Sequence, residues 1–141
     1  MRAVLAAVIF VGVSPGFAAE PSQADALYRL SGKYAVCAAY YTVGVTCLRN
    51  ESVRADYLEA QHKATIFGYA AGAKAGVSVE GLYFESENAM DSMKAIMKSD
   101  CDNIAIAVER YAEPCEALMK DAKESSVLST EGTVIPREQL N

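Results

Sequence analysis

The chain has 141 residues, a formal net charge of −5 and hydrophobic residues at 52% of its positions. This length fits one domain with a single hydrophobic core. The negative charge disfavours nucleic acid as a partner, because contacts to phosphate need clustered lysine and arginine. It is compatible with a partner protein that carries a basic surface.

Residues 1–18 have the features of a cleavable secretory signal peptide. Arg2 supplies a positive charge, and the uncharged apolar segment 3–13 follows it. Small residues near its end fit cleavage after Ala18. A membrane span needs about 20 apolar residues, more than this segment offers. We therefore expect a periplasmic or secreted protein without a membrane span, whose single helical domain covers residues 19–124.

The rest of the chain predicts an all-α fold, an antiparallel bundle of four main helices. Apolar residues recur at steps of three and four over 27–48, which is typical of an amphipathic helix. Because no charged residue interrupts 34–48, this first helix should be buried on most sides. Asn50 should cap a second helix over residues 51–75.

Two further helices follow. Ser78 should cap a third helix over residues 80–98, and Asp100 should cap a fourth, which keeps its apolar period across Pro114. That proline should either kink the fourth helix or open a short fifth one. Residues 125–141 turn to serine, threonine, glycine and isolated apolar residues, which predicts a mobile C-terminal tail.

A row of glycines occupies the C-terminal half of the second helix. Gly68, Gly72 and Gly76 lie four residues apart, so they share one face of the helix. A glycine inside a helix costs on the order of 1 kcal/mol relative to alanine, and a closely packed neighbour is the expected compensation. Gly76 is better explained as a helix stop. For Gly68 and Gly72 the sequence leaves two alternatives, packing within the chain or a homodimer contact.

Four cysteines indicate two disulfides in an oxidising compartment. Within one helix Cys37 and Cys47 would lie about 15 Å apart, and Cys101 and Cys115 about 21 Å apart, whereas bridged Cα atoms lie within about 7 Å. The bonds should therefore join the first helix to the fourth. These helices run antiparallel in an up-down bundle, which pairs Cys37 with Cys115 and Cys47 with Cys101. A local Cys37–Cys47 bond across a hairpin at Gly44 is the alternative. The spacings do not resemble those of a zinc site.

Acidic residues cluster after position 79, and together with one tyrosine they are the candidate binding residues. Tyrosine is common at interfaces, because it combines apolar area with a polar tip. A solvated acidic face is the competing explanation for the carboxylates. The candidate residues are Glu80, Tyr83, Glu85, Glu87 and Asp91.

Three methionines provide the best hypothesis for a metal site. Met90, Met93 and Met97 share one helical face, and thioethers are soft ligands that suit Cu(I). Methionine also fills irregular gaps in hydrophobic cores, which is the explanation we favour. We therefore expect no cofactor, and periplasmic copper handling is the alternative function.

No catalytic motif is recognisable. The only histidine, His62, has no nucleophile implied near it, and signatures of hydrolases and of phosphate-binding loops are absent. We expect a non-enzymatic exported protein that binds another envelope or secreted protein. An inhibitor or immunity protein against a secreted enzyme fits by analogy of size, acidity and disulfides. A small envelope chaperone is a further alternative, which the sequence neither supports nor excludes.

Overall fold

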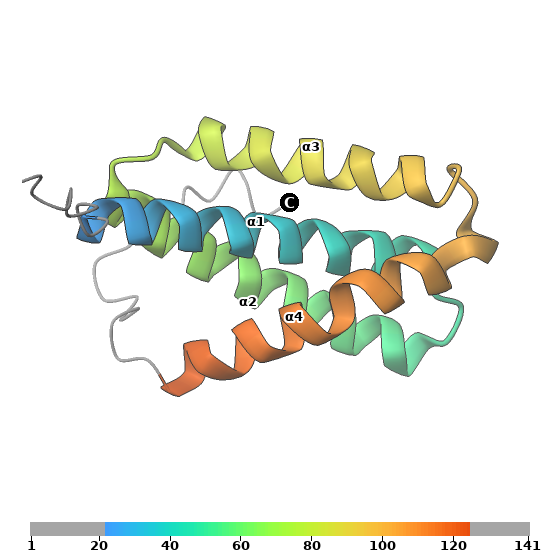
Figure 1. Ribbon diagram of the computed structural model, residues 1–141. Coiled ribbons are helices and arrows are strands. Elements are labelled where there is room, and N and C mark those ends of the chain that lie inside the picture. Colours follow the sequence, from blue (N-terminus) through green and yellow to red (C-terminus); the bar gives the residue numbers. More distant parts are fainter. Residues whose placement is uncertain (1–21, 125–141) are drawn as a thin grey trace, which may run out of the picture.

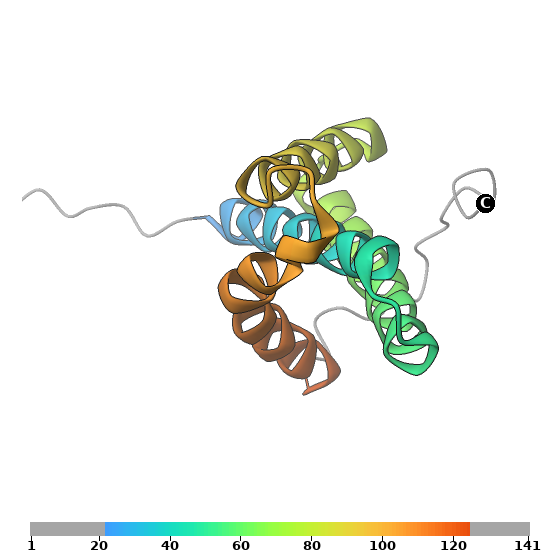
Figure 2. The same ribbon diagram turned by 90° about the vertical axis from the view of Figure 1, so that its right-hand side faces the viewer.

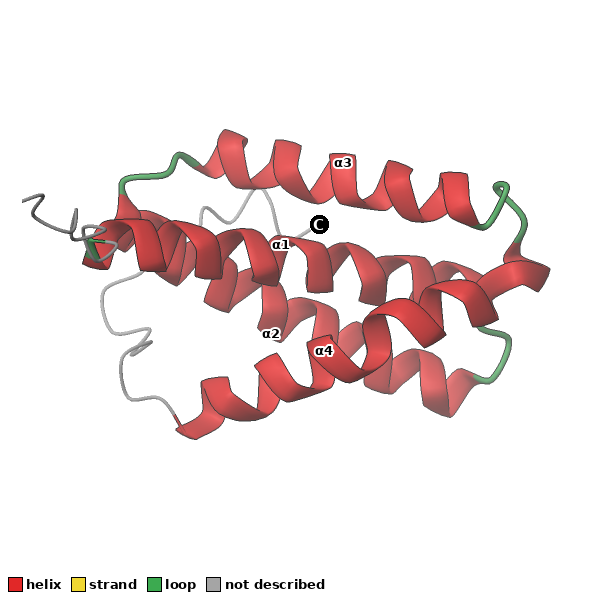
Figure 3. Ribbon diagram, viewed as in Figure 1, coloured by secondary structure: helices red, strands yellow, loops and turns green. Residues whose placement is uncertain are grey.

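The structure, a computed structural model, describes residues 22–124; the predicted signal peptide and tail lie outside the described residues. Four helices alternate in direction in this part of the chain: α1 (Gln23–Cys47), α2 (Glu51–Ala75), α3 (Val79–Ile96) and α4 (Ile104–Glu124) (Figure 1). A 3-10 turn, η1 (Cys101–Asn103), precedes α4. No strand occurs between residues 22 and 124 (Figure 3). The predicted all-α bundle of four main helices is therefore confirmed.

Helix α1 is the central helix of the bundle. Seen end-on, α2, α3 and α4 lie around it (Figure 2), and α1 packs most extensively against α2 and α3. From Tyr34 to Gly44 almost every residue of α1 is buried. The prediction of a helix buried on most sides is confirmed, because a helix enclosed by three neighbours leaves no face for charged side chains.

The helix ends fall at the residues that favour them. Ser22 and Asp25 form a capping box at the start of α1, and the Asp25 N–H donates to Ser22 Oγ at 3.1 Å. The predicted caps of α2 and α3 are confirmed, since Asn50 and Ser78 each accept a backbone N–H, at 3.2 and 3.1 Å. Gly76 ends α2 with a φ of 76°, a left-handed conformation that glycine adopts without strain.

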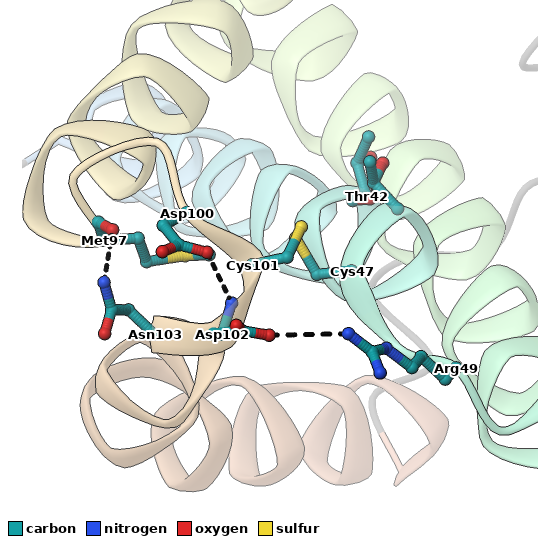
Figure 4. Close-up of a disulfide and its surroundings, with 9 residues drawn as sticks. Thr42, Cys47, Arg49, Met97, Asp100, Cys101, Asp102 and Asn103 are labelled. Carbon is teal, nitrogen blue, oxygen red and sulfur yellow. Dashed lines mark hydrogen bonds and ion pairs between the residues drawn. A yellow bond between two sulfur atoms is a disulfide. The ribbon is translucent and has the colours of Figure 1, made fainter.

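Helix α3 ends two residues before the predicted boundary at position 98. Lys98 and Ser99 both have a φ of 55°, in the left-handed region, so the chain turns there. Asp100 caps η1 rather than α4 directly, accepting a backbone N–H at 2.9 Å. The Asn103 side chain donates to the carbonyl oxygen of Met97 at 3.0 Å and ties the turn to the end of α3 (Figure 4).

Both disulfides join the α4 region to α1, as predicted. The Cα atoms of Cys37 and Cys115 lie 5.4 Å apart, and those of Cys47 and Cys101 lie 5.0 Å apart. The alternative bond between Cys37 and Cys47 is therefore wrong. The Cys37–Cys115 bond lies in the core, whereas Cys101 of the other bond is exposed.

Helix α4 continues through Pro114 as one helix, so the alternative of a short fifth helix is wrong. It packs less extensively against α1 than α2 and α3 do. A groove of about 520 Å³ separates the two helices, and its lining includes Val36, Tyr111 and Leu118. Two disulfides and the apolar side of α4, which brings Ala107 and Met119 into the core, hold this helix to the bundle.

The row of glycines packs within the chain. A Cβ on Gly68 would lie 3.3 Å from the Cβ of Tyr34 on α1, and one on Gly72 would lie 2.6 Å from Cδ1 of Leu82 on α3. The close neighbours that the glycines require are thus α1 and α3. Both glycines are buried, so neither is exposed for the homodimer contact considered above.

Four tyrosines form an aromatic cluster between α1, α2 and α4. The ring centroids of Tyr40, Tyr41, Tyr57 and Tyr111 lie 5.1 to 6.2 Å apart in the contacting pairs. A Cβ on Gly44 would overlap the ring of Tyr57. Gly44, considered from the sequence as the site of a hairpin, instead lies inside α1 and lets an aromatic ring of α2 pack against the helix backbone.

Candidate functional site

The candidate binding residues all lie on α3, but helical geometry divides them between different sides of the helix. Glu80, Glu87 and Asp91 are separated by seven and four residues, so they share one face, and all three are exposed. Tyr83 lies at the edge of this face that borders α2, where it lines a cleft with residues of that helix. Glu85 lies at the opposite edge, next to α1.

Two adjacent aromatic side chains are exposed on the same face. Tyr83 is 59% exposed and Phe84 63%, more than any other large hydrophobic residue between positions 22 and 124. Phe84 was not among the residues predicted from the sequence. The available signal was its spacing, four residues after Glu80 and three before Glu87, which places it on the same face. We call Glu80, Tyr83, Phe84, Glu87 and Asp91 the α3 face.

Glu85 does not belong to the α3 face. The hydroxyl of Tyr28 on α1 donates to its Oε1 at 3.2 Å. Its Oε2 is buried without a hydrogen-bond partner among the described residues, and would lie 3.2 Å from a Cβ on Gly32. Glu85 therefore links α3 to α1 at a point where glycine leaves room for a carboxylate.

The carboxylates of the α3 face differ in their partners. Glu87 accepts a hydrogen bond from the Tyr83 hydroxyl, and this bond, together with the carboxylate charge, raises the pKa of Tyr83. Asp91 forms an ion pair with Lys94 at 3.5 Å, an exposed contact worth about 0–1 kcal/mol. None of the ion pairs between described residues involves Glu80 or Glu87. These two residues therefore give the face its uncompensated negative charge.

Met90 and Met93 lie on the inner side of α3 and Met97 directly follows this helix; all three belong to the core or pack against it. Met93 is wholly buried. Met90 and Met97 line a cavity of about 190 Å³ beside the Cys47–Cys101 bond, and Met93 is not part of that lining. The shared face predicted from the sequence is present, but the thioether with the least access to a metal ion lies at its centre. Among residues 22–124, no three histidine, cysteine or acidic residues are grouped so that they could hold a metal ion.

An exposed ion pair lies near the Cys47–Cys101 bond. Arg49, directly after α1, pairs with Asp102 of η1 at 3.5 Å, and both side chains are strongly exposed (Figure 4). An ion pair with this exposure contributes little to stability. This region therefore positions η1 and the start of α4, and contains no further group that suggests a ligand.

Comparison with known proteins gives no relative: no protein-family model, curated protein or solved structure matches this chain. None of the helices within residues 22–124 has both the length and the apolar composition needed to cross a bilayer. A functional proposal for this protein therefore depends on the fold, the disulfides and the α3 face.

Proposed function

We propose that this protein is exported and binds another protein through the α3 face, without catalysing a reaction. The observation that carries the proposal is the exposed pair Tyr83 and Phe84 among the carboxylates of that face. Aromatic side chains are enriched in interfaces, because burying them on binding removes a large apolar area from water. Glu80 and Glu87 favour a partner with a basic contact surface.

The disulfides support the proposed location. Two disulfides are typical of secreted, periplasmic or extracellular proteins and rare in the cytosol. The signal peptide predicted over residues 1–18 agrees with export. In its most specific form, the proposal is that this protein acts as an inhibitor or immunity protein and blocks a secreted enzyme.

The test is capture of a partner from envelope and culture-supernatant proteins of the source cell, followed by affinity measurement with the purified pair. The variant Tyr83→Ala/Phe84→Ala removes the two exposed rings and should keep the fold. We expect it to weaken binding at least tenfold, roughly the loss of one or two central interface side chains. Binding of the unaltered protein should also weaken as ionic strength rises.

The matched control is Leu58→Ala/Ile106→Ala, which truncates two exposed apolar residues on α2 and α4. It should leave the affinity unchanged. Equal losses in the two double variants would reject the α3 face as the binding surface. Identical affinities at low and high ionic strength would remove the role assigned to the carboxylates.

A further inference from the structure

A cleft of about 240 Å³ lies between α2 and α3, beside the α3 face. Its floor consists of small buried residues, Ala38 of α1 with Ala64 and Gly68 of α2. None of these three residues has a side chain larger than a methyl group. Tyr69 of α2 and Tyr83 of α3 also line the cleft, so aromatic rings stand on both of its sides.

The cleft carries one negative charge and no positive one. Glu87 belongs to its lining and accepts the hydrogen bond from Tyr83. The phenols of Tyr69 and Tyr83 are close enough to interact electrostatically. The lining contains no lysine or arginine. The carboxylate of Glu87 is therefore not neutralised from within the cleft.

We infer that this cleft receives the side chain of an arginine from the protein partner, an inference that rests on the proposed function. The guanidinium would lie among the two tyrosines and Glu87, where cation–π attraction and charge-assisted hydrogen bonds act on the same group. Its methylene stem would lie along the floor of small apolar residues, as long basic side chains commonly do.

Size and charge separate arginine from other ligands. Clefts for cofactors and drug-sized molecules typically measure about 300–1,000 Å³, so a cleft of 240 Å³ suits a single side chain better. Glu87 repels an anionic ligand. Lysine has the right charge, but its ammonium is more strongly hydrated and lacks the planar fork that pairs with a carboxylate and stacks on a ring.

The test is an NMR titration of the full disulfide-bonded chain with N-acetyl-L-arginine amide. The matched ligand is N-acetyl-L-citrulline amide, which has nearly the same shape but no charge. We expect saturable shifts of the amide signals of Thr65, Gly68 and Glu87, with the citrulline compound binding at least about tenfold more weakly. Glu87→Gln should weaken arginine binding by about tenfold as well.

The control variant Glu109→Gln removes the same charge from an exposed position on α4, and should not change arginine binding. Equal affinity for the two ligands, or equal weakening by the two variants, would indicate general charge attraction and overturn the inference. A partner that depends on Tyr83 and Phe84 but binds Glu87→Gln undiminished would overturn it too, and would leave the proposed function standing. Weaker partner binding by Glu87→Gln, together with unchanged binding by Glu109→Gln, supports the inference.

Discussion

The hydroxyl oxygens of Tyr40 on α1 and Tyr57 on α2 lie 2.6 Å apart and share a hydrogen bond. Tyr40 is almost completely buried. Burial raises the pKa of Tyr40, and the hydrogen bond to Tyr57 raises it further. The two phenols therefore satisfy each other's polar groups at a partly buried contact, and they link the two helices that pack most extensively.

Removing one hydroxyl of this pair should destabilise the protein more than removing both. Tyr57→Phe leaves the buried Tyr40 hydroxyl unpaired, and we expect a loss of about 1–3 kcal/mol in the free energy of unfolding. Adding Tyr40→Phe removes the unpaired group and should restore part of that loss. Urea unfolding of both single variants and the double variant gives the coupling energy. Strictly additive losses would argue against the bond.

The tyrosine cluster also predicts how stability depends on alkaline pH. Burial, with smaller effects from Glu116 and Tyr57, raises the pKa of Tyr41 from 10.0 to about 12. A tyrosine whose pKa is higher in the folded state keeps its stabilising contribution below the unfolded pKa, and loses it as the pH rises through the folded pKa. Stability should therefore fall between about pH 10 and pH 12.

Alkaline titration, monitored by phenolate absorbance together with helical circular dichroism, tests this dependence. Tyr41→Phe should remove one late-ionising phenol and reduce the slope of stability against pH. If all phenols of the folded protein ionised together near pH 10, the cluster would not be shielded from water as the structure describes.

Gly44 and Gly81 offer a matched pair of glycine-to-alanine substitutions inside helices. A Cβ on Gly44 would overlap the ring of Tyr57, so Gly44→Ala should cost about 1–3 kcal/mol through overpacking. A Cβ on Gly81 would meet its nearest neighbour, Val77, at 3.4 Å, which is ordinary contact. Gly81→Ala should therefore stabilise the protein by up to about 1 kcal/mol, through helix propensity alone. Thermal unfolding tests both expectations: the melting temperature should fall for Gly44→Ala and rise for Gly81→Ala.

The two disulfides should contribute unequally. Cys37–Cys115 spans 78 residues and is buried, whereas Cys47–Cys101 spans 54 residues and is partly exposed. Replacing either pair with alanine should cost about 2–4 kcal/mol by freeing the unfolded chain. Loss of the buried pair should cost more, because it also leaves a cavity in the core. Urea unfolding of the two double variants measures both values, and a larger loss for the Cys47–Cys101 variant would contradict this order.

Replacing Met90, Met93 and Met97 together with leucine tests whether the methionine face does more than fill the core. Leucine has a similar volume, so the triple variant should remain folded, with a cost of less than about 1.5 kcal/mol per site. We expect Cu(I) titration to give the same result for the variant and the unaltered protein. A Cu(I) affinity that only the unaltered protein has would instead establish the copper-handling alternative.

Much of the fold follows from local chemistry. Asn50, Ser78 and Gly76 act on the backbone within one turn, so their residue types alone locate helix ends. Distance excludes a bond between two cysteines far apart on one helix, and the antiparallel directions of the first and fourth helices then select the pairing. Lys98 and Ser99 adopt a left-handed turn that their residue types do not favour, which is why the predicted end of α3 was two residues late.

The arrangement of neighbours is harder to predict. The absence of charged residues over 34–48 predicts that α1 is enclosed, but not which helix lies on each side of it. The cleft depends on small residues from α1 and α2 meeting two tyrosines and a carboxylate in space, and no single segment contains that pattern. Glu85 is different: a helical wheel alone places it roughly 100° or more from Glu87 and Asp91, so helical geometry could have separated it from the α3 face.

Both disulfides join the α4 region to α1, and none of the four cysteines belongs to the α3 face. In Figures 1 and 2, α3 and α4 lie on different sides of α1. The α3 face lies on α3 alone, and the cleft beside it is lined by residues of α1, α2 and α3. Reduction would thus lower the stability of the bundle by freeing the unfolded chain, without removing a contact that the α3 face makes. The reduced protein would then still bind its partner but would unfold more readily. The disulfides would determine the stability of the protein rather than its specificity.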